Sequence, residues 1–382
     1  MDFVGKDIFT GTVKHTFQVG FDYKKNDLKQ LSYSGLYGLK PGDTKTEHSL
    51  NYIDIIDVTQ SITNTFPQEY ATISFKNKTE TPSRSSSYGI MLQEVMTIND
   101  YVKTILGLRY SYGSSSDNTS TQETTGDAWN PMVGLMITPI KNINLFGSYT
   151  TTTSLRSAAN KKEDGSEIGP SNTKQWEFGV KSDWLNNRLR FNFTYFKIKN
   201  ANLSHKAYDD AGVEQTFYEI AGDLLRDGVE VELSGRILPN LQVMLGYAYL
   251  DARYQNSPVY ENGSAPMNAP EHTANGWIYY TLDRSVLKGL SFGIGTYYVG
   301  KRPINDYSLS PDGHGSMTGK KPFDMPAYTT VNAQLAYTYN KVTARVFFNN
   351  IFDEIGYNSY YRGGYINQID PRNFATTLSY QF

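Results

Sequence analysis

Apolar and polar residues alternate with a period of two in many segments of the chain. In the last segment, Phe374, Leu378 and Tyr380 fall on one face, whereas the small polar residues Thr377 and Ser379 fall on the other. The same split recurs in residues 106–112, 241–249, 290–298 and 342–349. Because successive side chains of a β-strand point to opposite faces of a sheet, these segments predict strands with one apolar and one polar face.

Short and long connections alternate between these predicted strands. The short turns fall at residues 99–100, 141–143, 186–187, 239–240, 284–287 and 340–341. The long polar segments are residues 24–84, 113–129, 154–171, 202–224, 254–269, 300–326 and 353–370. A soluble β-sandwich also has alternating strands, but strict alternation of turns and loops is typical of a transmembrane antiparallel up-and-down β-barrel, with short periplasmic turns and long extracellular loops. The chain therefore predicts an all-β fold of about fourteen strands.

The aromatic content supports this interpretation. The chain contains 30 Tyr, 19 Phe and 32 Gly, which favours strands and turns. No segment approaches the roughly 18 consecutive apolar residues that a membrane-spanning helix needs. Tyrosines near the predicted strand ends are expected to form aromatic girdles at the lipid headgroups, namely Tyr110, Tyr112, Tyr247, Tyr249, Tyr297 and Tyr298.

Charge and motifs argue against several function classes. Lys+Arg 36 nearly balance Asp+Glu 38, so no basic surface for nucleic acid is expected. The chain has no cysteine, no G-x-S-x-G motif and no metal-ligand spacing among its five histidines. Glu230 and Glu232 lie two residues apart on one strand, which a polar barrel interior explains better than acid–base catalysis. We therefore expect no enzyme activity, no metal site and no cofactor.

Ordered motifs suggest a family. Asn350-Ile351-Phe352-Asp353 is one of them, and Gly228-Val229-Glu230-Val231-Glu232 is another. Others occupy residues 15–23, 88–94, 106–110, 145–150, 175–181, 269–272, 298–302 and 378–382. In their order and spacing they resemble the C-terminal barrel of TonB-dependent siderophore receptors across essentially the whole chain.

The resemblance implies a larger architecture. Transporters with a plugged lumen have about 22 strands, so residues 1–382 would form the C-terminal portion of the barrel. The family's plug domain, its TonB-contacting segment and its early strands have no counterpart in this sequence, and the first residues show no export signal. We expect the chain to be a fragment of a longer product; the alternative is that the first and last strands pair to close a smaller barrel.

The resemblance also implies a function and a location. It implies uptake of a ferric siderophore across the bacterial outer membrane, with iron arriving already chelated rather than as a cofactor. The implied partners are the siderophore, outer-membrane lipid, the TonB complex through the missing N-terminal part, and the barrel-assembly machinery through the C-terminal strand. The alternative is a stand-alone passive pore for small solutes.

Candidate contact residues follow from chemistry and from the predicted loops. Aromatic faces pack against chelating groups, and arginines complement an anionic chelate. The candidates for ligand binding are Arg156, Arg302, Tyr307, Tyr357, Tyr360, Tyr361 and Arg362. The alternative is that these tyrosines only pack against each other or line the rim. The candidates for membrane insertion lie on the last strand, namely Phe374, Leu378, Tyr380 and Phe382.

Overall fold

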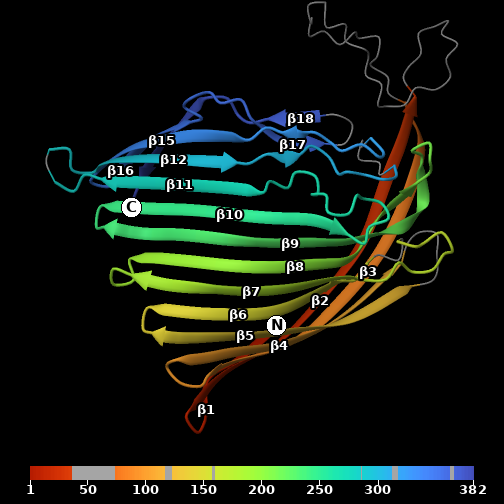
Figure 1. Cartoon of the computed structure of the whole chain (residues 1–382), viewed down its shortest axis with the longest axis horizontal. Coiled ribbons are helices and arrows are strands. Elements are labelled where there is room, and N and C mark those ends of the chain that lie inside the picture. The colour runs from red at the N-terminus through yellow and green to blue at the C-terminus, as the bar shows by residue number, and fades with distance from the viewer. Residues whose placement is uncertain (37–73, 117–122, 157–159, 285, 312–316, 362–364) are drawn as a thin grey trace, which may run out of the picture.

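The computed structural model of the chain describes residues 1–36, 74–116, 123–156, 160–284, 286–311, 317–361 and 365–382. Fifteen strands form one antiparallel sheet in which neighbours follow chain order (Figure 1). Across the described residues, no helix is long and apolar enough to cross a membrane. The all-β, antiparallel, up-and-down prediction is confirmed.

The strands of the main sheet are β1 (Asp2–Thr10), β2 (Val13–Leu36), β3 (Ser74–Thr97), β4 (Val102–Ser116), β5 (Thr124–Ile140), β6 (Ile143–Ser154), β7 (Ser171–Trp184), β8 (Leu189–Tyr208), β9 (Glu214–Leu238), β10 (Leu241–Gln255), β11 (His272–Thr281), β12 (Leu290–Val299), β15 (Tyr328–Tyr339), β16 (Val342–Asn349) and β19 (Asn373–Tyr380). Two further two-stranded sheets pair β13 (Arg302–Pro303) with β14 (Asp324–Met325) and β17 (Tyr357–Tyr361) with β18 (Tyr365–Gln368).

The main sheet has one strand more than the sequence predicts, and that strand is β1. Its pairing with β2 shifts between Gly5 and Ile8, so its apolar residues do not keep a period of two. A turn at Gly11, whose φ is +63°, leads into β2. Strands β1 and β19 are the two edges of this sheet.

The six predicted short turns are confirmed over the residues that the structure describes, which leave out Ser285 in the turn between β11 and β12. They lie along one rim, which we call the short-turn rim. The opposite long-loop rim differs in part from expectation. The expected loop 202–224 is mostly strand, because β8 continues to Tyr208 and β9 begins at Glu214. Similarly, β2 and β3 pair as far as Leu36 and Ser74, and Figure 1 shows them reaching beyond their neighbours. Backbone hydrogen bonds do not depend on side-chain polarity, so the ladder continues where the sequence becomes polar.

One face of the sheet is apolar from strand to strand. Ile278 of β11 pairs with Ile294 of β12, and Phe348 of β16 pairs with Phe374 of β19; all four side chains are exposed. The opposite face is polar, and there Ser291 is only 5% exposed. An exposed apolar face this broad is unfavourable in water but suits a lipid-facing barrel wall.

Aromatic rings gather on this apolar face toward the long-loop rim. Tyr110 contacts Trp129 at 4.8 Å between ring centroids, and Tyr149 contacts Trp176 at 4.5 Å. The prediction for Tyr297 is wrong, because it pairs with Asn275 on the polar face. Only every second residue of a strand reaches one face, so Tyr297 and its neighbour Tyr298 cannot both belong to one girdle.

Asn350 explains the Asn-Ile-Phe-Asp motif that follows β16. Its side-chain Nδ2 donates to the carbonyl oxygens of Glu354 (2.9 Å) and Asp370 (3.1 Å), and its Oδ1 accepts from the amide of Glu354 (2.8 Å). The residue is buried and has a φ of +48°, a conformation that asparagine tolerates better than most residues. The motif therefore fixes the turn that leaves β16 to the segment that enters β19.

We expect Asn350→Ala to lower the free energy of unfolding by about 2–4 kcal/mol, because buried backbone groups lose their partners and alanine is strained at positive φ. Denaturant titration in micelles, followed by tryptophan fluorescence, measures this. Asn350→Gly relieves the strain but does not restore the lost hydrogen bonds. Its free energy of unfolding should therefore lie between those of the unaltered protein and Asn350→Ala. Asn358→Ala, an exposed asparagine of the same loop, serves as the control. Equal stability of Asn350→Ala and this control would contradict the assignment.

Candidate functional site

The connection between β6 and β7 folds across the polar face of β4 and β5. A Cβ placed on Gly113 would lie 3.3 Å from Leu155, and one on Gly126 would lie 3.6 Å from it. These glycines face each other in the β4–β5 pairing. The absence of side chains at both positions lets Leu155 lie against the backbone of the sheet.

Residues 160–170 of this connection form an ordered loop. Lys161 and Glu167 form an isolated β-bridge, and the amide of Lys162 donates to the carbonyl of Ser166 at 2.9 Å. The amide of Tyr218 on β9 donates to the carbonyl of Lys161 at 2.8 Å, and Ile168 is buried. The loop is thus attached to β9 at one end and to β4 and β5 at the other.

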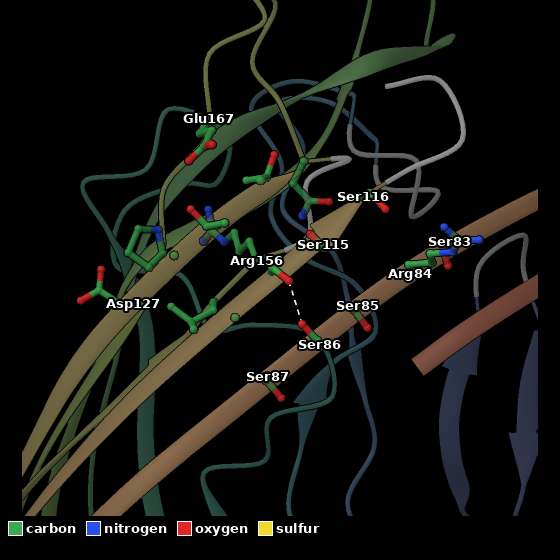
Figure 2. A pocket seen from close by; sticks show the side chains of 18 of the residues that line it. Ser83, Arg84, Ser85, Ser86, Ser87, Ser115, Ser116, Asp127, Arg156 and Glu167 are labelled. Atoms are coloured by element: carbon green, nitrogen blue, oxygen red, sulfur yellow. Dashed lines mark hydrogen bonds between the residues drawn. The ribbon is translucent and has the colours of Figure 1, made fainter. Parts of the chain in front are cut away.

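A cavity of ≈ 440 Å³ lies between this loop and the long-loop ends of β3, β4 and β5 (Figure 2). We call it the serine cavity, because hydroxyl groups predominate in its lining. Its serines and principal charged residues are Ser83, Ser85, Ser86, Ser87, Ser114, Ser115, Ser116, Lys24, Arg84, Asp127, Arg156 and Glu167. Figure 2 shows the serines in a row along β3, with Arg156 nearby.

Arg156 is the most distinctive group of the serine cavity. Its guanidinium donates to the backbone carbonyl of Asn202 through Nη2, whereas its buried Nη1 has no hydrogen-bond partner among the described residues. Burial lowers the pKa of Arg156 from its usual value, but a guanidinium remains protonated at any physiological pH. A buried N–H without an acceptor favours a ligand oxygen that can supply one.

The wall adjoining the cavity is braced by an ion pair across three strands. Arg109 on β4 reaches Asp22 on β2 at 2.8 Å, and a Cβ on Gly89 of β3 would lie 2.2 Å from the guanidinium. The intervening residue must therefore be glycine for this pair to form. Because both charged groups are exposed, the pair contributes little stability but fixes the orientation of Arg109.

A second group of loops packs together farther along the long-loop rim. Asp306 accepts hydrogen bonds from the hydroxyl of Tyr254 and from the amide of Met267, both at 2.8 Å. Ala221, Leu224, Tyr254, Val259 and Tyr260 form a buried cluster. The loop that follows β12 is therefore attached by hydrogen bonds to β10 and to the loop that follows β10, beside this small core.

The predicted ligand residues fall at two places. Arg156 lines the serine cavity, whereas Arg302 is 3% exposed and donates to the carbonyl oxygens of Tyr357 and Asn358. The guanidinium of Arg302 also lies 5.6 Å from the centre of the Tyr328 ring. Arg302 thus attaches one loop to another.

The other predicted tyrosines add less to a site. Tyr307 is half-buried, and its carbonyl accepts from the amide of Glu261 at 2.9 Å. The side chains of Tyr360 and Tyr361, and all of Arg362, lie outside the described residues. Ligand binding by these residues stays a prediction.

The serines of β3 and β4 were not predicted as site residues. They lie in or beside segments expected to be loops, residues 24–84 and 113–129. The detectable signal is the spacing of Ser83, Ser85 and Ser87, which places all three on one face of a strand. Knowing that β3 extends past the apolar band is needed to interpret that spacing.

The residues predicted for membrane insertion lie on β19 and just after it. Phe374, Leu378 and Tyr380 are exposed, and Tyr380 meets Phe382 edge-to-face at 5.1 Å. Their role in insertion stays a prediction. In the part of the chain that is described, no group of three or more His, Asp or Glu side chains is placed to hold a metal ion.

Comparison with known proteins identifies the family. Residues 2–351 match the family described as "TonB dependent receptor-like, beta-barrel". The chain belongs to this family. The motif-based resemblance is thereby confirmed, and the family consists of receptors and transporters rather than enzymes.

Individual relatives of this TonB-dependent receptor barrel support the family assignment. It is 24% identical to the metal-pseudopaline receptor CntO of Pseudomonas aeruginosa, over 100% of this chain and 50% of that protein. It is 25% identical to the ferrioxamine B receptor of Salmonella typhimurium, over 90% of this chain and 44% of that protein. The crystal structure of the Pseudomonas aeruginosa ferripyoverdine receptor bound to ferripyoverdine shares the fold, with a TM-score of 0.77 at 19% identity over 100% of this chain and 47% of that one. The chain spans about half the length of these relatives.

We expect Gly113→Val to displace Leu155 and detach the loop over the serine cavity. A Cβ at position 113 would already lie 3.3 Å from Leu155, so the branched side chain of valine has no room there. Hydrogen–deuterium exchange of residues 160–168 should become about tenfold faster. Ser115→Val, on the same strand and face, should leave that exchange unchanged. Equal exchange in both variants would show that Leu155 does not hold the loop.

Proposed function

We propose that the chain forms part of the barrel wall of an outer-membrane receptor that takes up a ferric siderophore, and that the serine cavity contacts the incoming chelate. The observation that carries the proposal is the cavity itself, with its hydroxyl lining and the buried Nη1 of Arg156, which has no hydrogen-bond partner in the described part of the chain. Siderophores present many oxygen atoms, and hydroxyl and guanidinium groups are suitable donors for them.

The two faces of the sheet support the proposed location. The exposed apolar face would contact lipid, and its aromatic rings would lie near the headgroups. The long-loop rim would then face the outside of the cell and the short-turn rim the periplasm. In this orientation the serine cavity opens on the side from which a chelate arrives.

The relatives support the proposed cargo. Proteins similar to this chain include receptors named for ferrioxamine B and for ferric pyoverdine, and the TM-score of 0.77 links the fold to a receptor with bound ferripyoverdine. Iron would enter as part of this cargo, with no resident cofactor. A passive pore is the less favoured alternative, because these relatives are named as receptors.

Energised transport would need more than this wall. We expect a plug domain and a TonB-contacting segment to supply it in a longer receptor, since the relatives are about twice as long as this chain. The last strand would carry the signal for the barrel-assembly machinery, through Phe374, Leu378, Tyr380 and Phe382. Catalysis is not part of the proposal.

Arg156→Gln should weaken binding of an anionic ferric carboxylate chelate by about tenfold or more, because a hydrogen bond to a charged group contributes about 1.5–3 kcal/mol. Binding is measured by fluorescence quenching on the receptor as it occurs in its membrane, with a neutral ferric trihydroxamate as the second probe.

Arg188→Gln is the matched control, because Arg188 lies in the turn between β7 and β8 at the short-turn rim. It should leave both affinities unchanged. Unchanged binding in Arg156→Gln, or an equal loss in both variants, would exclude the serine cavity as a contact site. Absence of any ferric chelate binding by the unaltered receptor would exclude the proposed cargo.

A further inference from the structure

A second cavity, of ≈ 480 Å³, lies against β9, β10 and β11 close to the short-turn rim. Arg188, in the turn between β7 and β8, also lines it, and we call it the arginine cavity. Cross-strand pairing arranges six further side chains of the lining in two rows on the polar face. They are Ser234, Met244 and Trp277 in one row and Arg236, Gln242 and Tyr279 in the other.

Trp277 and Met244 give the arginine cavity an apolar floor. A Cβ on Gly293 would lie 2.7 Å from the Trp277 ring, and one on Gly295 would overlap it. The ring therefore lies over the bare backbone of β12, which covers one of its faces and leaves the rest of it toward the cavity. Its cross-strand partner Met244 is 61% exposed, although Met244 belongs to the polar face.

The two arginines of the cavity are held together at the backbone. The amide of Arg236 donates to the carbonyl of Arg188 at 2.7 Å, and a Cβ on Gly235 would overlap that carbonyl. Gly235 has a φ of +139°, a conformation that other residues rarely adopt, so this contact requires glycine. Both arginine side chains are exposed. The sheet thus fixes two cations at neighbouring positions of one cavity.

No carboxylate balances this positive charge, since none of the described residues that line the cavity is acidic. Within the described ranges no ion pair involves Arg188 or Arg236, and the nearby Arg190 pairs with Asp183 at 3.0 Å. Nε of Arg188 donates to the carbonyl of Leu185 at 2.9 Å, which leaves its two Nη groups for other acceptors. Two guanidiniums in this state favour an anion, and a carboxylate can accept two parallel hydrogen bonds from each.

The other groups of the arginine cavity fit a sugar. The C–H face of a pyranose ring packs well against a flat aromatic ring such as that of Trp277. Ser234, Gln242 and Tyr279 can donate to and accept from hydroxyl and acetamido groups. An acidic peptide would match the charge but has no such flat apolar face. The volume of ≈ 480 Å³ is within the usual range for a small-molecule site.

We propose that the arginine cavity binds a carboxylated amino sugar of the cell-wall glycan, with the sugar ring on Trp277 and the carboxylate between Arg188 and Arg236. In the orientation proposed above, the short-turn rim faces the periplasm, where this glycan lies. Such binding would tether the barrel wall to the cell wall. The inference rests on the proposed membrane location and orientation, but not on the identity of the cargo.

The test is a calorimetric titration of the whole receptor, purified from its own membrane, with two matched probes. N-acetylglucosaminyl-N-acetylmuramic acid carries the carboxylate, and N,N′-diacetylchitobiose is the same disaccharide without the lactyl group that bears it. The carboxylated disaccharide should bind about tenfold more tightly, because it adds hydrogen bonds to a charged group. Arg188→Gln or Arg236→Gln should remove most of this preference, whereas Trp277→Leu should weaken the binding of both sugars.

Arg284→Gln is the matched control, because Arg284 is an exposed arginine of the turn between β11 and β12 and does not line the cavity. It should bind both sugars normally. Absence of sugar binding, equal affinity for the two disaccharides, an equal loss in Arg284→Gln, or tighter binding of a tetra-aspartate peptide would overturn the proposal. Circular dichroism checks that each variant keeps its sheet. Ferric chelate binding, measured on the same samples, should be unchanged in every variant, so a failure of the proposed cargo is seen separately from a failure of the glycan site.

Discussion

The fold depends on a continuous antiparallel ladder of backbone hydrogen bonds whose two faces meet different surroundings. In a lipid phase every backbone donor and acceptor needs a partner within the protein, and the fifteen paired strands provide this except at the edges β1 and β19. The alternation of side chains along each strand then determines which face is apolar and which is polar. The apolar row from Ile278 to Phe374 and the polar-face serines Ser83, Ser85 and Ser87 are opposite results of the same rule.

The ladder also explains how the serine cavity is built from small residues. Glycines at positions 89, 113 and 126 leave shallow strips of bare backbone on the polar face. Arg109 crosses one strip and Leu155 lies on another. The long side chains of Arg109 and Leu155 can therefore lie flat against the sheet, where larger residues in place of these glycines would exclude them. This contact fixes the position of the loop that carries Leu155 and Arg156.

Much of the fold could be predicted, because period-two alternation and turn residues are local signals. The short turns and the apolar face follow from the sequence. Strand β1 is not predicted, because a register shift interrupts its period-two alternation. The strand ends beyond the apolar band are not predicted for another reason. Their side chains are polar on both faces, so their sequence resembles that of a loop. The site was harder to predict. Arg156 is predicted from residue type and position and lines the serine cavity, but its role in binding stays a prediction. The burial of Arg302 and the serine row depend on contacts between segments far apart in the chain.

The hydrogen bonds that attach the loop after β12 to β10 and to the loop after β10 have a consequence for how such receptors change. Asp306 belongs to one loop, but its two hydrogen-bond donors belong to β10 and the other loop. A chimera that exchanged only one of these loops would leave a buried carboxylate facing foreign partners. Recombination and engineering would therefore succeed more often when both loops are transferred together, as a single inherited module.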